Sequence, residues 1–241
     1  MSTNPETKLV NILNKMSLHD RFTYYCEHND RITSTKNVYL QNFNCYCSLP
    51  LTEGNSKVDA LIFDLLAIVT CLNCKSCKST CYAIKAQRQY SDTLLKRTIN
   101  TWLAKHDLPT LQKIIIDQLS HTKRTIVRIH SSGDFLSQAY IDMWTSIAAM
   151  FPHIRFYTYS KVLHIFDFSA FEALPNTNIV RSILPDGSIN YGPEDYVKAK
   201  AKEFNATICP YRAGMKKENK PHCGRSCFKC VSNQLVLFVQ H

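Results

Sequence analysis

The chain has 241 residues, of which 45% are hydrophobic and 20% charged, enough to enclose one sizeable core. Six glycines and nine prolines are too few for a collagen-like or linker-dominated chain, and the longest apolar run, residues 60–69, is interrupted by Asp64 and too short to cross a bilayer. The N-terminal segment has no signal-peptide pattern, so we expect a cytoplasmic protein with no membrane partner.

The charge balance favours an anionic partner. Lys and Arg number 29 against 19 Asp and Glu, a formal net charge of +10, which is typical of proteins that bind DNA or RNA. The basic residues crowd two cysteine-rich stretches, 71–97 and 209–230. Because an iron–sulfur cluster held by four thiolates carries a net charge of about −2, two clusters would neutralise part of this surplus. Nucleic-acid binding and cluster neutralisation both remain open.

The first half of the chain predicts a cap, a buried segment and then helices. Residues 1–57 are polar and aromatic and predict an N-terminal cap or extension, while residues 58–241 predict an α/β domain. The apolar run 60–70 predicts a buried strand or short buried helix that leads directly into Cys71. Residues 82–106 combine helix formers with apolar residues near helical spacing and predict a helix or helix pair, and Pro109 opens a further helix.

A regular alternation of strands and helices follows. Strands are predicted at 125–130, 153–160 and 178–184, with a turn at 131–134 and helices at 136–150 and 166–174 between them. Such a βαβαβ series forces parallel strands with right-handed crossovers, as in doubly wound sheets and barrels. We expect a parallel (β/α)-barrel-like or partial-barrel core with Cys-rich metal-binding loops, completed by a helix at 193–204 and a final strand at 235–241.

The chain has eleven cysteines and no secretion signal, which favours metal ligands or reactive thiols over disulfides. Eight of them form two sets, and Cys26, Cys45 and Cys47 lie outside both. The first cysteine set comprises Cys71, Cys74, Cys77 and Cys81, and the second cysteine set comprises Cys209, Cys223, Cys227 and Cys230.

The first cysteine set has the C-x2-C-x2-C-x3-C spacing of bacterial ferredoxins, which wraps thiolates around an iron–sulfur cluster. Tyr82 stands where proline follows in ferredoxins, and the second set does not repeat the spacing, so a ferredoxin fold is disfavoured. Enzymes that generate radicals from S-adenosylmethionine usually carry Cys-x3-Cys-x2-Cys. Here Ile84 occupies the place of the third cysteine, so a standard enzyme of that class is disfavoured too.

The second cysteine set is looser and needs the chain to fold back before four ligands meet. Four thiolates suit zinc and iron–sulfur clusters equally well. Burial as cysteines without a ligand fits less well, because lysine-rich loops do not bury thiols as core residues.

Polar side chains follow the predicted parallel strands, whose carboxyl ends meet at one edge of a sheet. His130 and Asp134 follow one strand and Lys161 the next, and we predict catalytic acid/base roles for these three beside a metal. A turn with a helix cap is the structural alternative for Asp134. We predict contacts with anions or nucleic acid for the basic side chains Arg128, Arg181, Lys85 and Arg88. No familiar catalytic motif names the reaction.

Four segments, taken in order, resemble the phage and plasmid family called gene product eighty-eight: VTCLNCKSCKSTCYAIKAQRQY, VRIHSSGDFLSQAYIDMW, FYTYSK, and ICP with CGRSCFKC. The resemblance covers roughly residues 60–241 and implies a mobile-element origin and cysteine-bound metal in iron–sulfur form, with no established reaction. The family's first motif corresponds to Cys71, Cys77 and Cys81 followed by Tyr-Ala, and Cys74 is an additional cysteine. Three or four ligands at the first site therefore remain open.

The sequence leads to one main hypothesis and one alternative. The main hypothesis is an iron–sulfur protein of a mobile genetic element with two 4Fe-4S clusters held by the two cysteine sets, acting as a redox or nucleic-acid-associated enzyme. The alternative is a zinc-stabilised, non-catalytic protein that binds DNA or RNA. A small-molecule substrate or redox partner is not identified by any motif.

Overall fold

The computed structural model describes residues 50–55, 58–73, 81–210, 215, 221, 223, 227–232 and 234–239. The prediction for residues 1–49 and the ligand roles predicted for Cys74 and Cys77 lie outside these residues.

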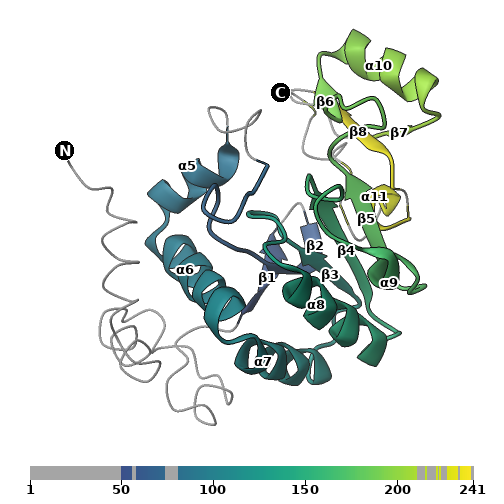
Figure 1. Cartoon of the computed structure of the whole chain (residues 1–241). Helices are drawn as coiled ribbons and strands as arrows, with labels where there is room; N and C mark the ends of the chain where they lie inside the picture. The colour runs from purple at the N-terminus through teal and green to yellow at the C-terminus, as the bar shows by residue number, and fades with distance from the viewer. Residues whose placement is uncertain are drawn as a thin grey trace. The chain divides into compact units, whose positions relative to one another are not determined.

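The larger sheet has five strands in the order of the chain, β1-β2-β3-β4-β5 (Figure 1). Its strands are β1 (Leu51–Asn55), β2 (Val58–Phe63), β3 (Ile126–Ile129), β4 (Arg155–Ser160) and β5 (Thr177–Arg181). β1 pairs with β2 antiparallel and the other neighbours are parallel. The predicted α/β class with a parallel core is confirmed. The described strands form an open sheet and not a closed barrel.

The crossover helices follow the prediction closely, since local signals define their ends. They are α5 (Tyr82–Gln89), α6 (Ser91–His106), α7 (Leu108–Ser120), α8 (Gln138–Met150) and the short α9 (Ser169–Glu172). Pro109 lies in the first turn of α7, where its missing N–H costs nothing, and the Asp107 carboxylate caps this helix by accepting from Thr110 N at 3.2 Å. Ser137 caps α8 in the same way through Tyr140 N.

One face of the sheet packs against helices. Because consecutive parallel strands lie side by side, right-handed crossovers place their helices on the same face. Phe63, Val127, Ile129 and Phe156 project from β2, β3 and β4 into this layer and are buried. Phe63 meets Trp144 of α8 with ring centroids 5.2 Å apart, edge to face. Figure 1 shows α6, α7 and α8 in a row along the sheet.

The opposite face packs against the C-terminal part of the chain. Val58, Ala60, Ile126 and Tyr157 form a buried cluster on it with Val231, which belongs to α11 (Lys229–Ser232). Cys223 and Cys230 pack against the same cluster. The second cysteine set therefore supplies part of the cover for this face.

A smaller parallel sheet has the order β6-β8-β7 and comprises β6 (Tyr191–Gly192), β7 (Thr207–Ile208) and β8 (Val236–Val239). It packs against α10 (Glu194–Glu203) through a small core of Leu184, Val197 and Leu237. β8 and α10 match predicted elements. The two-residue strands β6 and β7 were not predicted.

Two boundaries differ from the prediction. β2 ends at Phe63, and residues 64–70 form an irregular segment with a turn before Cys71, so the prediction of one continuous element from 60 to 70 is wrong. The chain leaves the sheet there because Asp64 and Leu65 bond to the turn after β3, with Leu65 N donating to Ser132 O at 2.9 Å. β1 lies inside the segment predicted as an N-terminal cap and pairs with β2.

None of the helices in the described part of the chain has the length and hydrophobicity that crossing a bilayer requires.

Candidate functional site

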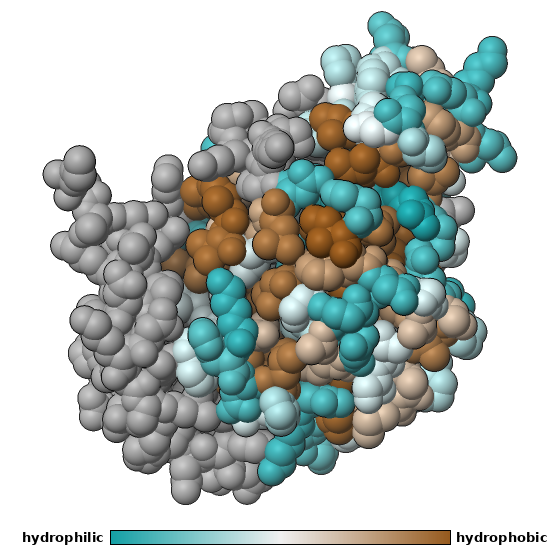
Figure 2. All heavy atoms as spheres, in the orientation of Figure 1, coloured by the Kyte–Doolittle hydropathy of each residue, from teal (hydrophilic) through white to brown (hydrophobic). Residues whose placement is uncertain are grey.

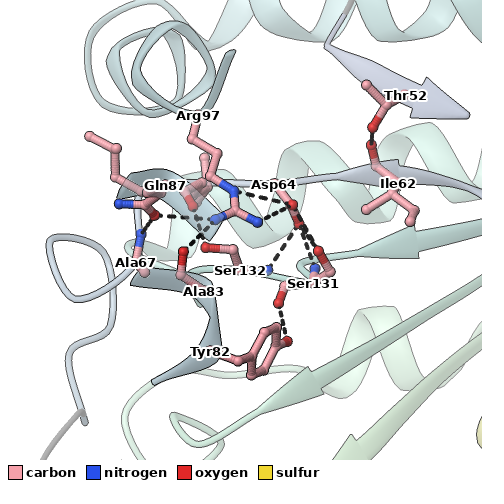
Figure 3. A network of polar contacts seen from close by, with 12 residues as sticks. Thr52, Ile62, Asp64, Ala67, Tyr82, Ala83, Gln87, Arg97, Ser131 and Ser132 are labelled. Carbon is pink, nitrogen blue, oxygen red and sulfur yellow. Dashed lines mark hydrogen bonds and ion pairs between the residues drawn. The ribbon is translucent and has the colours of Figure 1, made fainter. Parts of the chain in front are cut away.

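The carboxyl edge of the sheet is organised by Asp64, which follows β2 directly (Figure 3). Its carboxylate accepts from Ser131 N at 2.7 Å, from Ser131 Oγ at 2.6 Å and from Ser132 N at 2.9 Å. Arg97 of α6 donates to the other oxygen, Oδ2, at 2.8 Å. Sequence reasoning missed this role, although the signal was there: Asp64 is the charged residue that interrupts the apolar run 60–69.

The same network holds α5 against this edge. Arg97 also donates to Ala83 O at 3.0 Å and to Gln87 Oε1 at 3.3 Å, and Gln87 accepts from Ala67 N at 2.7 Å. The Tyr82 hydroxyl donates to Ser131 O. Helix α5 begins one residue after Cys81, so these contacts position the end of the first cysteine set.

The turn after β3 packs closely on the segment that follows β2. Gly133 adopts a left-handed φ of 88°, and a Cβ there would lie 2.6 Å from Leu65 Cβ and 2.7 Å from Thr70 Oγ1. Only glycine combines this backbone conformation with such an approach. The turn thus brings the loops after β2 and β3 into direct contact.

His130 lies below the edge, inside the helix-side core. It takes a left-handed φ of 63°, its Nε2 lies 2.8 Å from the Tyr140 hydroxyl, and its ring meets Phe135 edge to face at 4.7 Å. Burial lowers its pKa to about 3, so the imidazole is neutral at neutral pH. Its Nδ1 is buried and has no hydrogen-bond partner among the described residues. The predicted catalytic histidine is therefore enclosed by aromatic side chains.

Asp134 joins the turn after β3 to the end of β4. It is buried and accepts from Ser160 Oγ at 2.9 Å, from Lys161 N at 2.9 Å and from Phe135 N at 2.8 Å. Burial raises its pKa to about 6, while these hydrogen bonds oppose the rise. Asp134 and Lys161 do meet, as predicted from their positions after neighbouring strands, through the backbone of Lys161.

The predicted anion-binding residues lie in different surroundings. Arg128 points from β3 to the face that carries the second cysteine set, with its guanidinium carbon 4.9 Å from the centre of the Tyr159 ring. Arg181 pairs with Glu172 at 3.2 Å. Lys85 is exposed on α5, and the side chain of Arg88 lies outside the described residues.

The described part of the first cysteine set lies at the carboxyl edge. Cys71 and Cys81 are partly buried, and Asn73, two residues after Cys71, donates to Lys161 O at 3.3 Å. Val69 and Leu72 beside Cys71 are 50% and 54% exposed. Figure 2 shows hydrophobic side chains gathered on the surface where α5 lies in Figure 1. An apolar surface thus borders this cysteine set.

The second cysteine set comes from three segments that the two sheets bring together. Cys209 N donates to Leu237 O at 2.8 Å, next to the smaller sheet. Cys223 forms β-bridges with Val58 of β2 and with Cys227, and Asp59 N donates to Cys223 O at 2.8 Å. These contacts attach Cys209 to β8 and Cys223 to β2, two strands that lie far apart in the sequence.

Cys230 completes this set on the face of the larger sheet. Asn178 of β5 donates to its carbonyl at 3.0 Å. Burial raises the pKa of the Cys230 thiol to about 12, a hydrogen bond with Tyr159 lowers it, and the charges of Cys209, Cys223 and Cys227 raise it further. The charges of the other three cysteines of the set thus act on Cys230. Within the described residues, no three His, Cys, Asp or Glu side chains are spaced as ligands of one metal ion.

The sequence pattern of the family described as Gene product 88 matches residues 25–239 of the chain. No curated protein and no solved structure matches.

Proposed function

The chain belongs to the Gene product 88 family, and we propose that it is an iron–sulfur protein of a mobile genetic element. In this proposal its two cysteine sets hold two 4Fe-4S clusters, and the protein acts as a redox or nucleic-acid-associated enzyme. The proposal depends most on the placement of the second cysteine set. Its four cysteines come from three segments, and Cys223 and Cys230 pack against the buried cluster that includes Tyr157 and Val231 on the face of the larger sheet. A bound cation or cluster would stabilise these cysteines as thiolates on this face.

The chemistry of the donors fits such a group. Thiolates are the ligands that iron–sulfur clusters and zinc share, and the Tyr159 hydroxyl bonds to Cys230. When bound, a 4Fe-4S cluster supplies one-electron transfer. Burial and hydrogen bonds to the sulfurs are the means by which a protein sets its potential, so Tyr159 and the apolar cluster around Val231 would tune this site.

The first cysteine set supports an active role. Cys71 and Cys81 lie at the carboxyl edge of the parallel strands, where α/β proteins bind their ligands, and Asn73 and Tyr82 tie this loop to Lys161 and Ser131. An iron with three cysteine ligands would have a position open for a substrate there. In this case Cys74→Ser should leave the iron content and visible spectrum of the full chain nearly unchanged, whereas Cys77→Ser should lower both. Equal losses from the two changes would contradict an open iron.

The main test is anaerobic purification of the full chain followed by iron, sulfide and zinc quantification and a visible absorption spectrum. We expect about eight irons and eight sulfides per chain. Cys230→Ser should lower the iron to about four, and Cys26→Ser, outside both sets, serves as the matched control and should leave it unchanged. A colourless protein with about two zincs and no sulfide would refute the iron–sulfur proposal in favour of the zinc-stabilised nucleic-acid-binding protein.

The link to nucleic acid is supported by the net charge of +10. If it holds, affinity for a single-stranded or duplex oligonucleotide should fall steeply and log-linearly as salt rises, because phosphate contacts release counterions. Absent or salt-independent binding would contradict this part of the proposal and favour a redox enzyme.

A further inference from the structure

Arg128 differs from the other arginines whose side chains are at least partly buried in the described residues. Arg97 pairs with Asp64 at 2.8 Å, Arg124 with Glu53 at 2.5 Å and Arg181 with Glu172 at 3.2 Å. No carboxylate lies within ion-pairing distance of Arg128 in the part of the chain that the structure describes, and its Nε is buried with no hydrogen-bond partner there.

The acidic residue whose charge acts on Arg128, Asp64, already has hydrogen-bond partners elsewhere. Asp64 contributes electrostatically to Arg128, yet its two oxygens accept from Ser131, Ser132 and Arg97. The immediate neighbours of Arg128 are instead aromatic. Its guanidinium stacks over Tyr159 at 4.9 Å, and Tyr157 occupies the paired position on β4. Tyr82, which follows Cys81, is also close enough to interact with its charge.

This position is suited to a ligand. Arg128 is the last residue but one of β3, near the carboxyl edge of the central strand, where parallel sheets bind substrates. A partly buried guanidinium without an acid partner loses part of its hydration, and a bound anion would compensate for this loss. Stacking on an aromatic ring fixes the guanidinium plane and leaves its fork of N–H donors to bind an oxyanion in two-point fashion.

We propose that Arg128 anchors a binding site for a small molecule that carries a carboxylate or phosphate group, held between the aromatic rings of Tyr82 and Tyr159. The anion would lie between the first cysteine set, through Tyr82, and the second, through Tyr159 and Cys230. This site does not depend on which metal the cysteines hold. A single partly buried cation ringed by tyrosines takes one anionic group, whereas a nucleic-acid backbone is followed by exposed cations such as Lys85.

The test is a titration of the purified full chain with sodium phosphate and, separately, sodium acetate, at constant ionic strength maintained with sodium chloride. The thermal unfolding midpoint should rise saturably with one of the two anions, with half-saturation in the millimolar range. Saturation with phosphate identifies a phosphate-bearing ligand, and saturation with acetate a carboxylate. Arg128→Lys should weaken that response at least tenfold, while the matched control Arg155→Lys, at an exposed site on the neighbouring strand, should not.

The proposal would be overturned by the absence of a saturable response to either anion or by an equal response in Arg128→Lys. Loss of iron from Arg128→Lys would overturn it too, because Arg128 would then be the counter-charge of a cluster. Oligonucleotide binding that requires Arg128 without any phosphate or acetate saturation would also overturn it. A second measurement needs no variant. Phenylglyoxal modifies accessible arginines, and the saturating anion should protect the Arg128 peptide from modification, as read by mass spectrometry. Equal modification with and without the anion would refute the site.

Discussion

Replacing Asp64 by Ala should destabilise the protein far more than removing a surface carboxylate. The side chains of Asp64 and Arg97 are 16% and 6% exposed, and their atoms Oδ2 and NH2 lie 2.8 Å apart. Removing one partner of a buried ion pair leaves an uncompensated charge and costs about 3–5 kcal/mol. The amide protons of Ser131 and Ser132 lose their acceptor at the same time.

A matched control is the ion pair of Lys198 with Glu194, which has nearly the same length, 2.9 Å, but side chains that are 62% and 54% exposed. Solvent screens this pair, and Glu194→Ala should cost about 0.5 kcal/mol or less. The two ion pairs therefore have nearly the same length and differ in burial and in the further hydrogen bonds that the carboxylate of Asp64 accepts.

The assay is equilibrium unfolding in urea, followed by circular dichroism. With a slope of about 2 kcal/mol per molar urea, a loss of about 4 kcal/mol lowers the midpoint by about 2 M for Asp64→Ala, against at most about 0.25 M for Glu194→Ala. Asp64→Asn keeps one acceptor oxygen without the charge and should fall between them. Equal midpoints for Asp64→Ala and Glu194→Ala, at unchanged slope, would refute the role of Asp64 as organiser of the carboxyl edge.

Two further predictions concern buried polar groups. The folded state holds His130 neutral with a pKa of about 3, whereas the histidine of the unfolded chain takes up a proton below about pH 6.5. Because protonation then favours the unfolded state, this residue should lower the free energy of unfolding by about 2 kcal/mol between pH 7.5 and pH 5. Asparagine tolerates the left-handed φ of this position, so His130→Asn should lose that part of the pH dependence in urea titrations, whereas the control His153→Asn, at an exposed position, should retain it. Identical pH profiles for the wild type and His130→Asn would contradict the assignment. Asn176 donates through Nδ2 to the carbonyls of Ala148, Phe151 and Ile154 at 2.9–3.1 Å. Asn176→Ala should therefore lower the free energy of unfolding by about 2–4 kcal/mol, because it leaves buried acceptors unsatisfied. A shift of the urea midpoint no larger than that of Glu194→Ala would show that water replaces the amide.

The alternating part of the fold could be predicted because its signals are local. Pro109 and Ser137 mark helix starts, and the strands between the helices are short apolar runs. The segment 60–70 could not be assigned by the same means. Residues 60–69 are apolar except for Asp64, whose partners at Ser131 and Ser132 lie far along the chain. Only the tertiary contacts therefore show where β2 ends.

The proximity of Asp134 and Lys161 was predictable, but the burial of His130 and the pairings of the arginines were not. Asp134 and Lys161 lie together, as expected for polar residues that follow neighbouring parallel strands. Sequence position does not reveal which carboxylate takes which arginine: Arg181 is paired with Glu172, while Arg128 stacks on an aromatic ring. Nor does periodicity show β6 and β7, since a two-residue strand exists only through its pairing with β8.

The consecutive strand order also decides when the protein can finish folding. All the crossover helices are made before the segment that covers the other face, and the bridge between Val58 and Cys223 closes a loop that spans most of the described chain. Closing such a loop is entropically slow. A nascent chain that ends before Cys223 can hold its five strands and their helices, yet it exposes Ala60, Ile126 and Tyr157 to solvent. The second face of the larger sheet is thus covered only after Cys223 and the segment that follows it have been made.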